Sequence, residues 1–168
     1  MEFFTRGEVA AITGLEKAVI KNWTTGRPLL ITPSIKQAKG VGTRNYYSIE
    51  DIYLFAVAGA LAKKGLPLDQ VQAVIDKVRT EWSRSVYVEA NLLIIDDRED
   101  WLDAELVPER LGLAQYLKDF TSEQDEIITV RYVINLKSLI RRIDENVKTL
   151  IGGSPAGPDK LHPEDVQS

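Results

Sequence analysis

The sequence contains no cysteine, one histidine and one methionine. Without cysteine, the chain can form neither disulfides nor thiolate metal sites, and it has no thiol nucleophile. The histidine, His162, lies next to Pro163 in a tail rich in glycine and proline, where an isolated imidazole is a poor candidate for a ligand or a base. A Ser-His-Asp triad is therefore not expected, and no pair of carboxylates stands out as catalytic. We expect that the protein is not an enzyme and holds no cofactor.

Long apolar runs are also lacking. The longest extends from Ile52 to Ala62, which is far shorter than the roughly 20 residues that cross a bilayer. The first residues, MEFFTRGE, include acids and lack the apolar core of a signal peptide. We expect a cytoplasmic protein with no membrane partner.

Metal-binding patterns are weak. Six carboxylates between residues 96 and 105 are oxygen ligands of the kind that a hard cation accepts. Their spacing is not that of an EF-hand loop, and the glycine of such a loop is missing. We interpret the run as a solvated acidic turn and expect no metal site.

Charge is unevenly distributed along the chain. Residues 1–84 hold 12 Lys and Arg against 8 Asp and Glu, whereas residues 85–168 hold 9 against 17. Residues 17 to 49 contain six bases and no acid. A polyanion would be attracted to this segment and repelled by the second half of the chain. A solvated basic face is the alternative interpretation, so the order of the structural elements has to decide.

Two short helices are expected at the start. Residues 5–8, Thr-Arg-Gly-Glu, form a capping box that begins a helix, and Gly14 ends it. A second helix is expected from Glu16 to Thr24, with its apolar residues on one face and its Lys and Asn residues elsewhere. Two short helices joined by a turn that contains glycine are typical of a helix-turn-helix, whose second helix enters the major groove of DNA.

A hairpin is expected next. Leu29–Thr32 and Thr43–Tyr47 have the composition of strands, and the loop between them, Pro33–Gly42, contains two bases and two glycines. This pattern predicts a wing with a basic tip. The glycines either let the tip approach a DNA backbone or simply make the turn. The absence of a following Gly-Lys-Ser/Thr argues against a nucleotide-binding loop.

Two further helices complete the first half. Ser48–Asp51 is a second capping sequence, and it opens a helix that extends through Lys64 and is stopped by Gly65. Pro67 precedes a fourth helix, whose apolar residues repeat at helical spacing as far as Trp82. We expect these apolar stripes to form the core.

In this first half the sequence resembles the MerR family of bacterial transcription regulators. The resemblance covers about 75 residues in the family's order and spacing. The matching stretches are Thr5–Leu15, Ile20–Trp23, Gly42–Ile52 and Lys64–Val71. It implies a winged helix-turn-helix that binds double-stranded DNA, a homodimer, and RNA polymerase as a further partner at the promoter.

The chain departs from the family in its recognition helix. Where family members carry Arg-Tyr-Tyr or Arg-Phe-Tyr, this chain has Lys21-Asn22-Trp23. Lysine can neutralise a phosphate or reach a guanine edge, but without the bidentate fork of arginine. Trp23 fills the core position of the second aromatic residue, or its indole N–H donates to a phosphate. In the wing, either Tyr46 or Tyr47 aligns with the tyrosine that contacts the DNA backbone.

These observations assign nine residues to DNA binding. Three lie in or near the groove, three lie on the wing side, two are looser phosphate contacts in the wing loop, and one is a phosphate contact at the start of the first helix. In that order they are Lys17, Lys21 and Asn22; Arg44, Tyr46 and Tyr47; Lys36 and Lys39; and Arg6.

The second half lacks the long dimerising helix that the family resemblance implies. It alternates strand-like runs with helical ones, which predicts a small α+β unit. Its core is lean, and pairing with a second copy is the simplest way to enlarge it. The expected elements are strands at Val86–Val88 and Leu92–Ile95, an acidic turn at Asp96–Asp100, a strand at Trp101–Val107, a helix at Pro108–Phe120, a strand at Ile127–Ile134, and a helix capped by Asn135 that reaches Leu150.

The predicted fold class is therefore α+β, in three parts. A winged helix-turn-helix domain covers residues 1–84, a small α+β domain for dimerisation or effector binding covers 85–151, and a disordered tail covers 152–168. We expect a sequence-specific regulator that binds a pseudo-palindromic site as a homodimer. Its effector, if it has one, cannot be named from the sequence.

Two other functions remain open. One is an architectural protein of the excisionase kind, which bends DNA for recombination with a similar fold; most such proteins lack a folded second half. The other is a ligand sensor or protein-interaction module in which the acidic half is the active part. In that case Tyr87, Trp101 and Tyr132 line a small pocket, although aromatic residues in strands are more often core.

Overall fold

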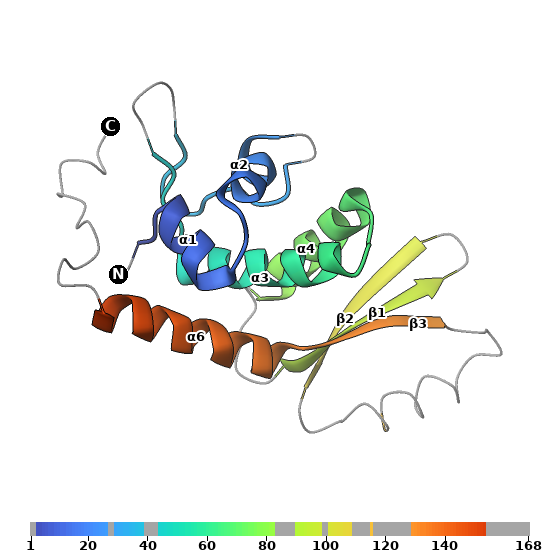
Figure 1. The fold of residues 1–168 in the computed structure, drawn as a ribbon. Coiled ribbons are helices and arrows are strands. Elements are labelled where there is room, and N and C mark those ends of the chain that lie inside the picture. The colour runs from blue at the N-terminus through green and yellow to red at the C-terminus, as the bar shows by residue number, and fades with distance from the viewer. Residues whose placement is uncertain are drawn as a thin grey trace.

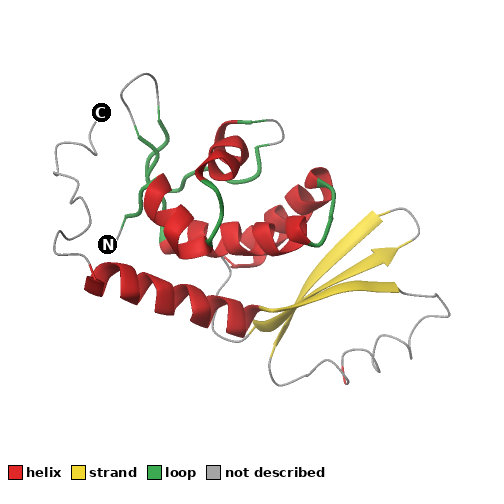
Figure 2. Ribbon diagram, in the orientation of Figure 1, coloured by secondary structure: helices red, strands yellow, loops and turns green. Residues whose placement is uncertain are grey.

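The computed structural model describes residues 3–26, 29–38, 44–82, 90–98, 101–108, 115 and 129–153. In this part of the chain, helices dominate and a three-stranded antiparallel sheet lies at one end (Figures 1 and 2). The helices are α1 (Arg6–Thr13), α2 (Lys17–Thr25), α3 (Ile49–Lys63), α4 (Leu68–Trp82) and α6 (Leu136–Gly153). The strands are β1 (Ala90–Arg98), β2 (Trp101–Pro108) and β3 (Thr129–Asn135).

The predicted capping boxes start α1 and α3. The Thr5 N–H donates to Glu8 Oε2 at 2.7 Å, and the Glu8 N–H donates to Thr5 Oγ1 at 3.4 Å. At α3, the Asp51 N–H donates to Ser48 Oγ at 3.2 Å, while the Ser48 N–H donates to Asp51 Oδ2 at 3.1 Å. Each box satisfies N–H groups that have no partner inside the helix. Gly14 ends α1 with φ at +75°, as expected for a left-handed helix cap.

The end of α3 is fixed by its own backbone. Gly65, with φ at +87°, donates to Ala62 O at 3.0 Å, and the Leu66 N–H donates to Leu61 O at 3.2 Å. These two bonds form a Schellman motif, which favours glycine at the left-handed position. The predicted stop at Gly65 is confirmed, and α4 begins directly after Pro67.

The predicted strand at Leu29–Thr32 is wrong. The N–H groups of Leu30 and Ile31 both donate to the carbonyl of Trp23, at 3.0 and 3.1 Å, and both side chains are buried. Because these backbone donors are used by the end of α2, the segment is an irregular link, buried at Leu30 and Ile31, and not a strand.

The hairpin pairs instead through bridges closer to its base. Tyr46 exchanges backbone hydrogen bonds with Lys36 at 2.9 and 3.4 Å, and Tyr47 exchanges a pair with Phe4, both at 2.9 Å. The wing base is therefore irregular. Tyr46 pairs with the expected loop, and Tyr47 pairs with the N-terminal segment. Residues 39–43, at the expected tip, lie outside the described residues.

The sheet has the order β2-β1-β3, with both pairs antiparallel. Leu93 lies opposite Leu106 on one side and Ile134 on the other, and Leu93 and Ile95 are fully buried. These residues form the inward face of the sheet.

Parts of the sequence-based assignment of the second half need correction. Asp96 and Asp97 belong to β1 and pair with residues of β2, so they are not part of a turn; residues 99–100 of the expected turn lie outside the described residues. Pro108 ends β2 and does not begin a helix. The expected strand at 86–88 lies outside the described residues, as does the expected helix at 108–120 apart from Pro108 and Gln115.

Helix α6 connects the sheet to the helix-turn-helix. The Asn135 side chain caps it as predicted, accepting the Ser138 N–H at 2.8 Å. Its apolar face then lies along α1 and α3 (Figure 1). Two polar contacts join the surfaces: Asn146 Nδ2 donates to the Ile12 carbonyl at 2.8 Å, and the Tyr53 hydroxyl donates to Asp144 Oδ1 at 2.5 Å.

The hydrophobic core is continuous between the two halves. It joins the apolar residues of α1 to α4 with those of β1 and α6. The second half therefore adds to the core of the first. The division into domains at residue 84 stays a prediction. None of the described helices is long and apolar enough to cross a membrane.

Replacing Tyr53 by phenylalanine tests the contact between α3 and α6. Burial raises the pKa of Tyr53 above its ordinary value of 10.0, and the hydrogen bond to Asp144 and the charges of Asp144 and Glu50 raise it further. Below pH 10 both folded and unfolded chains keep this proton; above it, only the unfolded chain loses it, so stability should fall as the pH rises.

We expect Tyr53→Phe to cost about 1 kcal/mol at neutral pH. It should also make the alkaline loss of stability shallower, as measured by urea unfolding between neutral pH and pH above 10. Tyr46→Phe is the matched control, because Tyr46 is only half-buried. Equal alkaline slopes for wild type and Tyr53→Phe would contradict the assigned role.

Candidate nucleic-acid interface

Helix α2 has one buried face and one exposed face. Ile20 is 0% exposed and Trp23 is 7% exposed. The Trp23 ring stacks on Phe55 of α3, with centroids 6.5 Å apart and planes 9° from parallel. The buried position of Trp23 therefore agrees with a role in the core and not with a phosphate contact. Lys21 and Asn22 lie on the other face, exposed to solvent.

At the C-terminus of α2, Gly26 lies very close to the backbone of Asn22. The Gly26 N–H donates to Asn22 O at 2.7 Å, and a Cβ at position 26 would lie 2.3 Å from that oxygen. Only glycine fits this close approach. Leu30 and Ile31, which bond to Trp23 O, are buried, whereas Lys21 and Asn22 remain exposed.

Two cations gather at the start of α1. Lys17, exposed at the first turn of α2, places its Nζ 3.9 Å from the position that a Cβ would take on Gly7. Arg6 is the first residue of α1, half-buried, with an Nε that has no hydrogen-bond partner among the described residues. The two cations favour an anion such as phosphate at this corner, although the Glu8 carboxylate already caps the start of the helix.

The wing base is organised by buried polar groups. Asn45, only 5% exposed, accepts the Ala38 N–H at 2.6 Å and so joins the two sides of the hairpin. Asp51 accepts both the N–H and the hydroxyl of Ser34, at 2.9 and 2.8 Å. The same carboxylate caps α3, and it therefore ties the start of the wing to that helix.

These supporting roles were not predicted from the sequence. The capping sequence identified Asp51 as a helix-start residue, but nothing in the pattern indicated its partner Ser34, which is 17 positions away. Asn45 resembles an ordinary turn residue until its burial is known.

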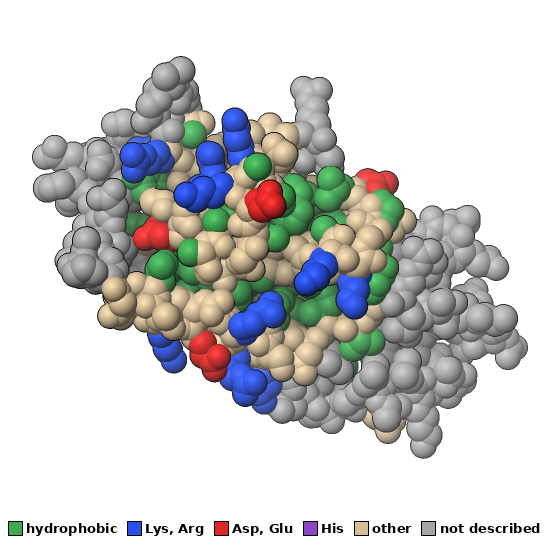
Figure 3. All heavy atoms as spheres, in the orientation of Figure 1, with side chains coloured by type: hydrophobic (Ala, Val, Ile, Leu, Met, Phe, Trp, Pro, Cys, Tyr) green, Lys and Arg blue, Asp and Glu red, His purple; other side chains and the backbone are tan. Residues whose placement is uncertain are grey.

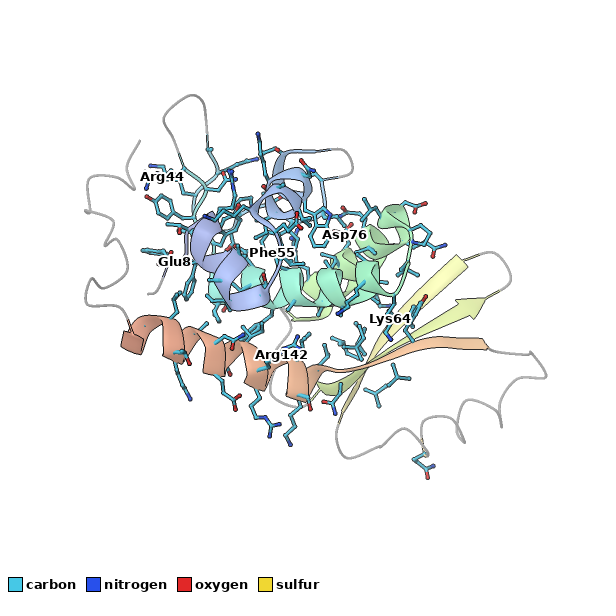
Figure 4. The ribbon with its side chains drawn as sticks, in the orientation of Figure 1. Glu8, Arg44, Phe55, Lys64, Asp76 and Arg142 are labelled. Atoms are coloured by element: carbon cyan, nitrogen blue, oxygen red, sulfur yellow. The ribbon has the colours of Figure 1, made fainter. Side chains whose placement is uncertain are left out.

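The wing side chains are placed differently from one another. Arg44 is exposed and lies at the wing in Figure 4, and Lys36 is half-buried beside Tyr46 in the bridge. Lys39 lies outside the described residues. On the face drawn in Figure 3, Lys and Arg side chains lie over α1, α2 and the wing base, and others lie across the lower part of the molecule, where α6 runs.

The two adjacent tyrosines have opposite environments. Tyr47 is 0% exposed, packs edge-on against Phe55 with centroids 5.5 Å apart, and accepts a hydrogen bond from the Asn45 amide at 3.3 Å. Its place in the core contradicts the prediction that it contacts DNA. Tyr46, which is half-buried, is the one that keeps access to the surface.

The candidate interface thus combines the exposed side of α2, the start of α1 and the wing base. Among the predicted residues, Lys17 lies beside the start of α1 and Lys36 lies beside Tyr46, while Lys21, Asn22 and Arg44 are exposed on α2 and the wing. Among the described residues, no group of three His, Cys, Asp or Glu could hold a metal ion. Polar and cationic groups around an amphipathic helix are suited to binding a polyanion, with no chemical reaction implied.

Comparison with known proteins agrees with this geometry. Residues 4–78 match the family of MerR HTH family regulatory proteins. Curated relatives from Mycobacterium bovis and Mycobacterium tuberculosis, each named an uncharacterized HTH-type transcriptional regulator, are 29% identical over 86 residues. That stretch is 51% of this chain and 36% of each relative, so the chain matches only about a third of their length.

The environments of the two tyrosines give a direct test. We expect Tyr46→Phe to weaken DNA binding about fivefold, as for one lost hydrogen bond, with stability nearly unchanged. Tyr47→Phe should instead lower stability by about 1–3 kcal/mol, because the buried Asn45 amide loses its acceptor. Fluorescence anisotropy and urea unfolding measure the two effects. Weaker DNA binding by Tyr47→Phe at unchanged stability would overturn the assignment.

Proposed function

Because residues 4–78 of this chain are a helix-turn-helix domain of the MerR family, we propose that the protein is a sequence-specific DNA-binding transcription regulator. The observation that carries the proposal is the orientation of α2. Its apolar side is fixed on α3 through Ile20 and Trp23, and this leaves Lys21 and Asn22 exposed for base edges.

The surrounding groups supply the phosphate contacts. Lys17 and Arg6 at the start of α1 hold one strand of the flanking backbone, and Arg44 and Tyr46 at the wing hold the other side. Lys36 and Lys39 add looser contacts along the wing. Phosphate contacts set the register of the protein on the duplex, whereas the α2 side chains select the sequence.

We further propose that the regulator acts as a homodimer on a pseudo-palindromic site. Two copies related by a two-fold axis place their α2 helices in major grooves about one helical turn, roughly 34 Å, apart or a multiple of that distance. Contact with RNA polymerase at the promoter is part of this proposal. The cytoplasm is the compartment in which such a regulator meets DNA.

The architectural alternative is less well supported. Excisionase-like proteins need little beyond the DNA-binding unit, whereas here β1 and α6 extend the core that holds α1 and α3. Selection of bound DNA from a random pool distinguishes the two functions. A regulator enriches one two-fold related sequence, and a protein that only bends DNA enriches deformable sequence without a fixed motif.

The salt dependence of binding tests the electrostatic part. We expect log K for the selected site to fall linearly with log[salt], because each neutralised phosphate releases counterions. Lys17→Ala should reduce the slope by about 1. Lys77→Ala, on α4, is the control and should leave the slope unchanged. A flat salt dependence in the wild type would exclude phosphate binding.

Lys21 and Asn22 test the base contacts. On the selected site, Lys21→Ala and Asn22→Ala should each cost about 1–3 kcal/mol of binding free energy, and each should relax selectivity at one position. Competition assays against single-base variants of the site measure this. An equal loss on random DNA would show that the residue contacts phosphate only.

A further inference from the structure

A pocket of about 760 Å³ lies between the wing base, the start of α3 and the second half of α6. Ser34 and Ile35 line it from the wing side, and residues 48–50 line it from the start of α3. Asp144, Val147, Lys148 and Ile151 line it from α6, where their spacing puts them on one face of the helix. Its volume is within the range of small-molecule sites, roughly 300–1,000 Å³.

The pocket has an aliphatic lining. Ile35, Ile49, Val147 and Ile151 come from three different segments and surround the same space. Ile35, Ile49 and Ile151 are only partly buried, so apolar surface remains available there. An apolar group of a ligand would gain by covering it.

Charged groups of both signs border this apolar surface. Glu50, Asp144 and Lys148 are among the residues that line the pocket. Asp144 uses Oδ1 to accept the Tyr53 hydroxyl, and its other oxygen has no partner among the described residues. The side chains of Glu50 and Lys148 form no hydrogen bond or ion pair within the described part of the chain.

Glu50 and Asp144 line the same pocket. Burial is the main cause that raises the pKa of Tyr53, and Asp144 and Glu50 both add to it. Glu50 comes from α3 and Asp144 from α6, so an ammonium group between them would join the two helices. An ammonium has three N–H donors and suits a site with two carboxylates.

We propose that this pocket binds a zwitterionic amino acid or dipeptide with an apolar side chain. The ligand's ammonium binds Glu50 and Asp144, its carboxylate binds Lys148, and its side chain covers the isoleucines and Val147. Molecules that lack one of the two charges leave Lys148 or the carboxylates without a counter-charge in the partly desolvated pocket, and so bind more weakly.

The ligand would also act on the wing. Ser34 and Ile35 directly precede Lys36, which pairs with Tyr46, and Ser34 is held by the Asp51 carboxylate. A ligand that bridges this segment to α6 fixes the wing base, so it changes DNA affinity. This step rests on the proposed function; the binding step does not.

Calorimetric titration of the full chain tests the binding step without DNA. The probes are L-leucine, L-phenylalanine and leucyl-leucine, with 3-methylbutylamine and 4-methylpentanoate as the two analogues of leucine that lack one charge. We expect at least one zwitterion to bind with Kd below about 1 mM, and leucine to bind at least tenfold more tightly than either analogue. If no zwitterion binds, or if the analogues bind as well as leucine, the proposal is wrong.

Substitutions then locate the site. Glu50→Gln and Lys148→Met should each weaken binding of the best zwitterion about tenfold, and Ile151→Trp, which fills the pocket, should abolish it. Glu145→Gln and Arg141→Met make the same kinds of change at exposed α6 positions that do not line the pocket. Circular dichroism verifies folding of each variant. Equal losses in the controls, or full binding by Ile151→Trp, would place the ligand elsewhere.

DNA affinity with and without the saturating zwitterion tests the regulatory step. We expect a change of at least threefold in Kd for the selected site, absent in Lys148→Met. Ligand binding with unchanged DNA affinity would overturn the regulatory step alone. Failure to bind any DNA would overturn the proposed function, while the titrations of the free protein would still decide the ligand site.

Discussion

The burial of α3 is the constraint on which the rest of the structure depends. Every residue from Asp51 to Ala58 is buried, so this helix has neighbours on all sides over its first turns. Phe55 stacks with Trp23 of α2 on one side and meets Tyr47 of the wing base edge-on at another. One buried ring therefore sets the positions of both parts of the candidate DNA interface relative to each other.

Polar groups at the start of α3 add direction to this packing. Apolar contacts hold surfaces together without fixing their register, whereas a buried carboxylate must have specific donors. Asp51 accepts hydrogen bonds from Ser48 and Ser34. These bonds fix the position of the wing base relative to the start of α3. Asn45 has the same effect inside the hairpin.

Helix α6 extends this arrangement to the far side of α1 and α3. It covers apolar surface of both helices, and Asn146 binds a carbonyl in the last turn of α1, where helix carbonyls lack internal partners. A change in the position of α6 would therefore reach the helix-turn-helix through α1 and the wing through the pocket beside α3. The proposed regulation depends on such a connection.

The sequence by itself determined the features that depend on near neighbours. The capping boxes at Thr5 and Ser48, the glycine stops at Gly14 and Gly65, and the exposed cations of α2 all follow from residues within one or two helical turns. Hydrophobic periodicity and local hydrogen bonding are short-range, so they can be predicted from the order of the residues alone. The family's order of helices was predicted in the same way.

Only the tertiary structure decided how these elements are used. Leu29–Thr32 has the composition of a strand, yet the N–H groups of Leu30 and Ile31 are taken by the Trp23 carbonyl near the end of α2. Tyr46 and Tyr47 are equivalent in sequence, and the position of Phe55 determines that Tyr47 is the buried one. Helix α6 likewise packs on α1 and α3, which precede it by more than 70 residues in the sequence. Contacts over such separations depend on which surfaces the whole chain brings together, and no local pattern encodes that choice.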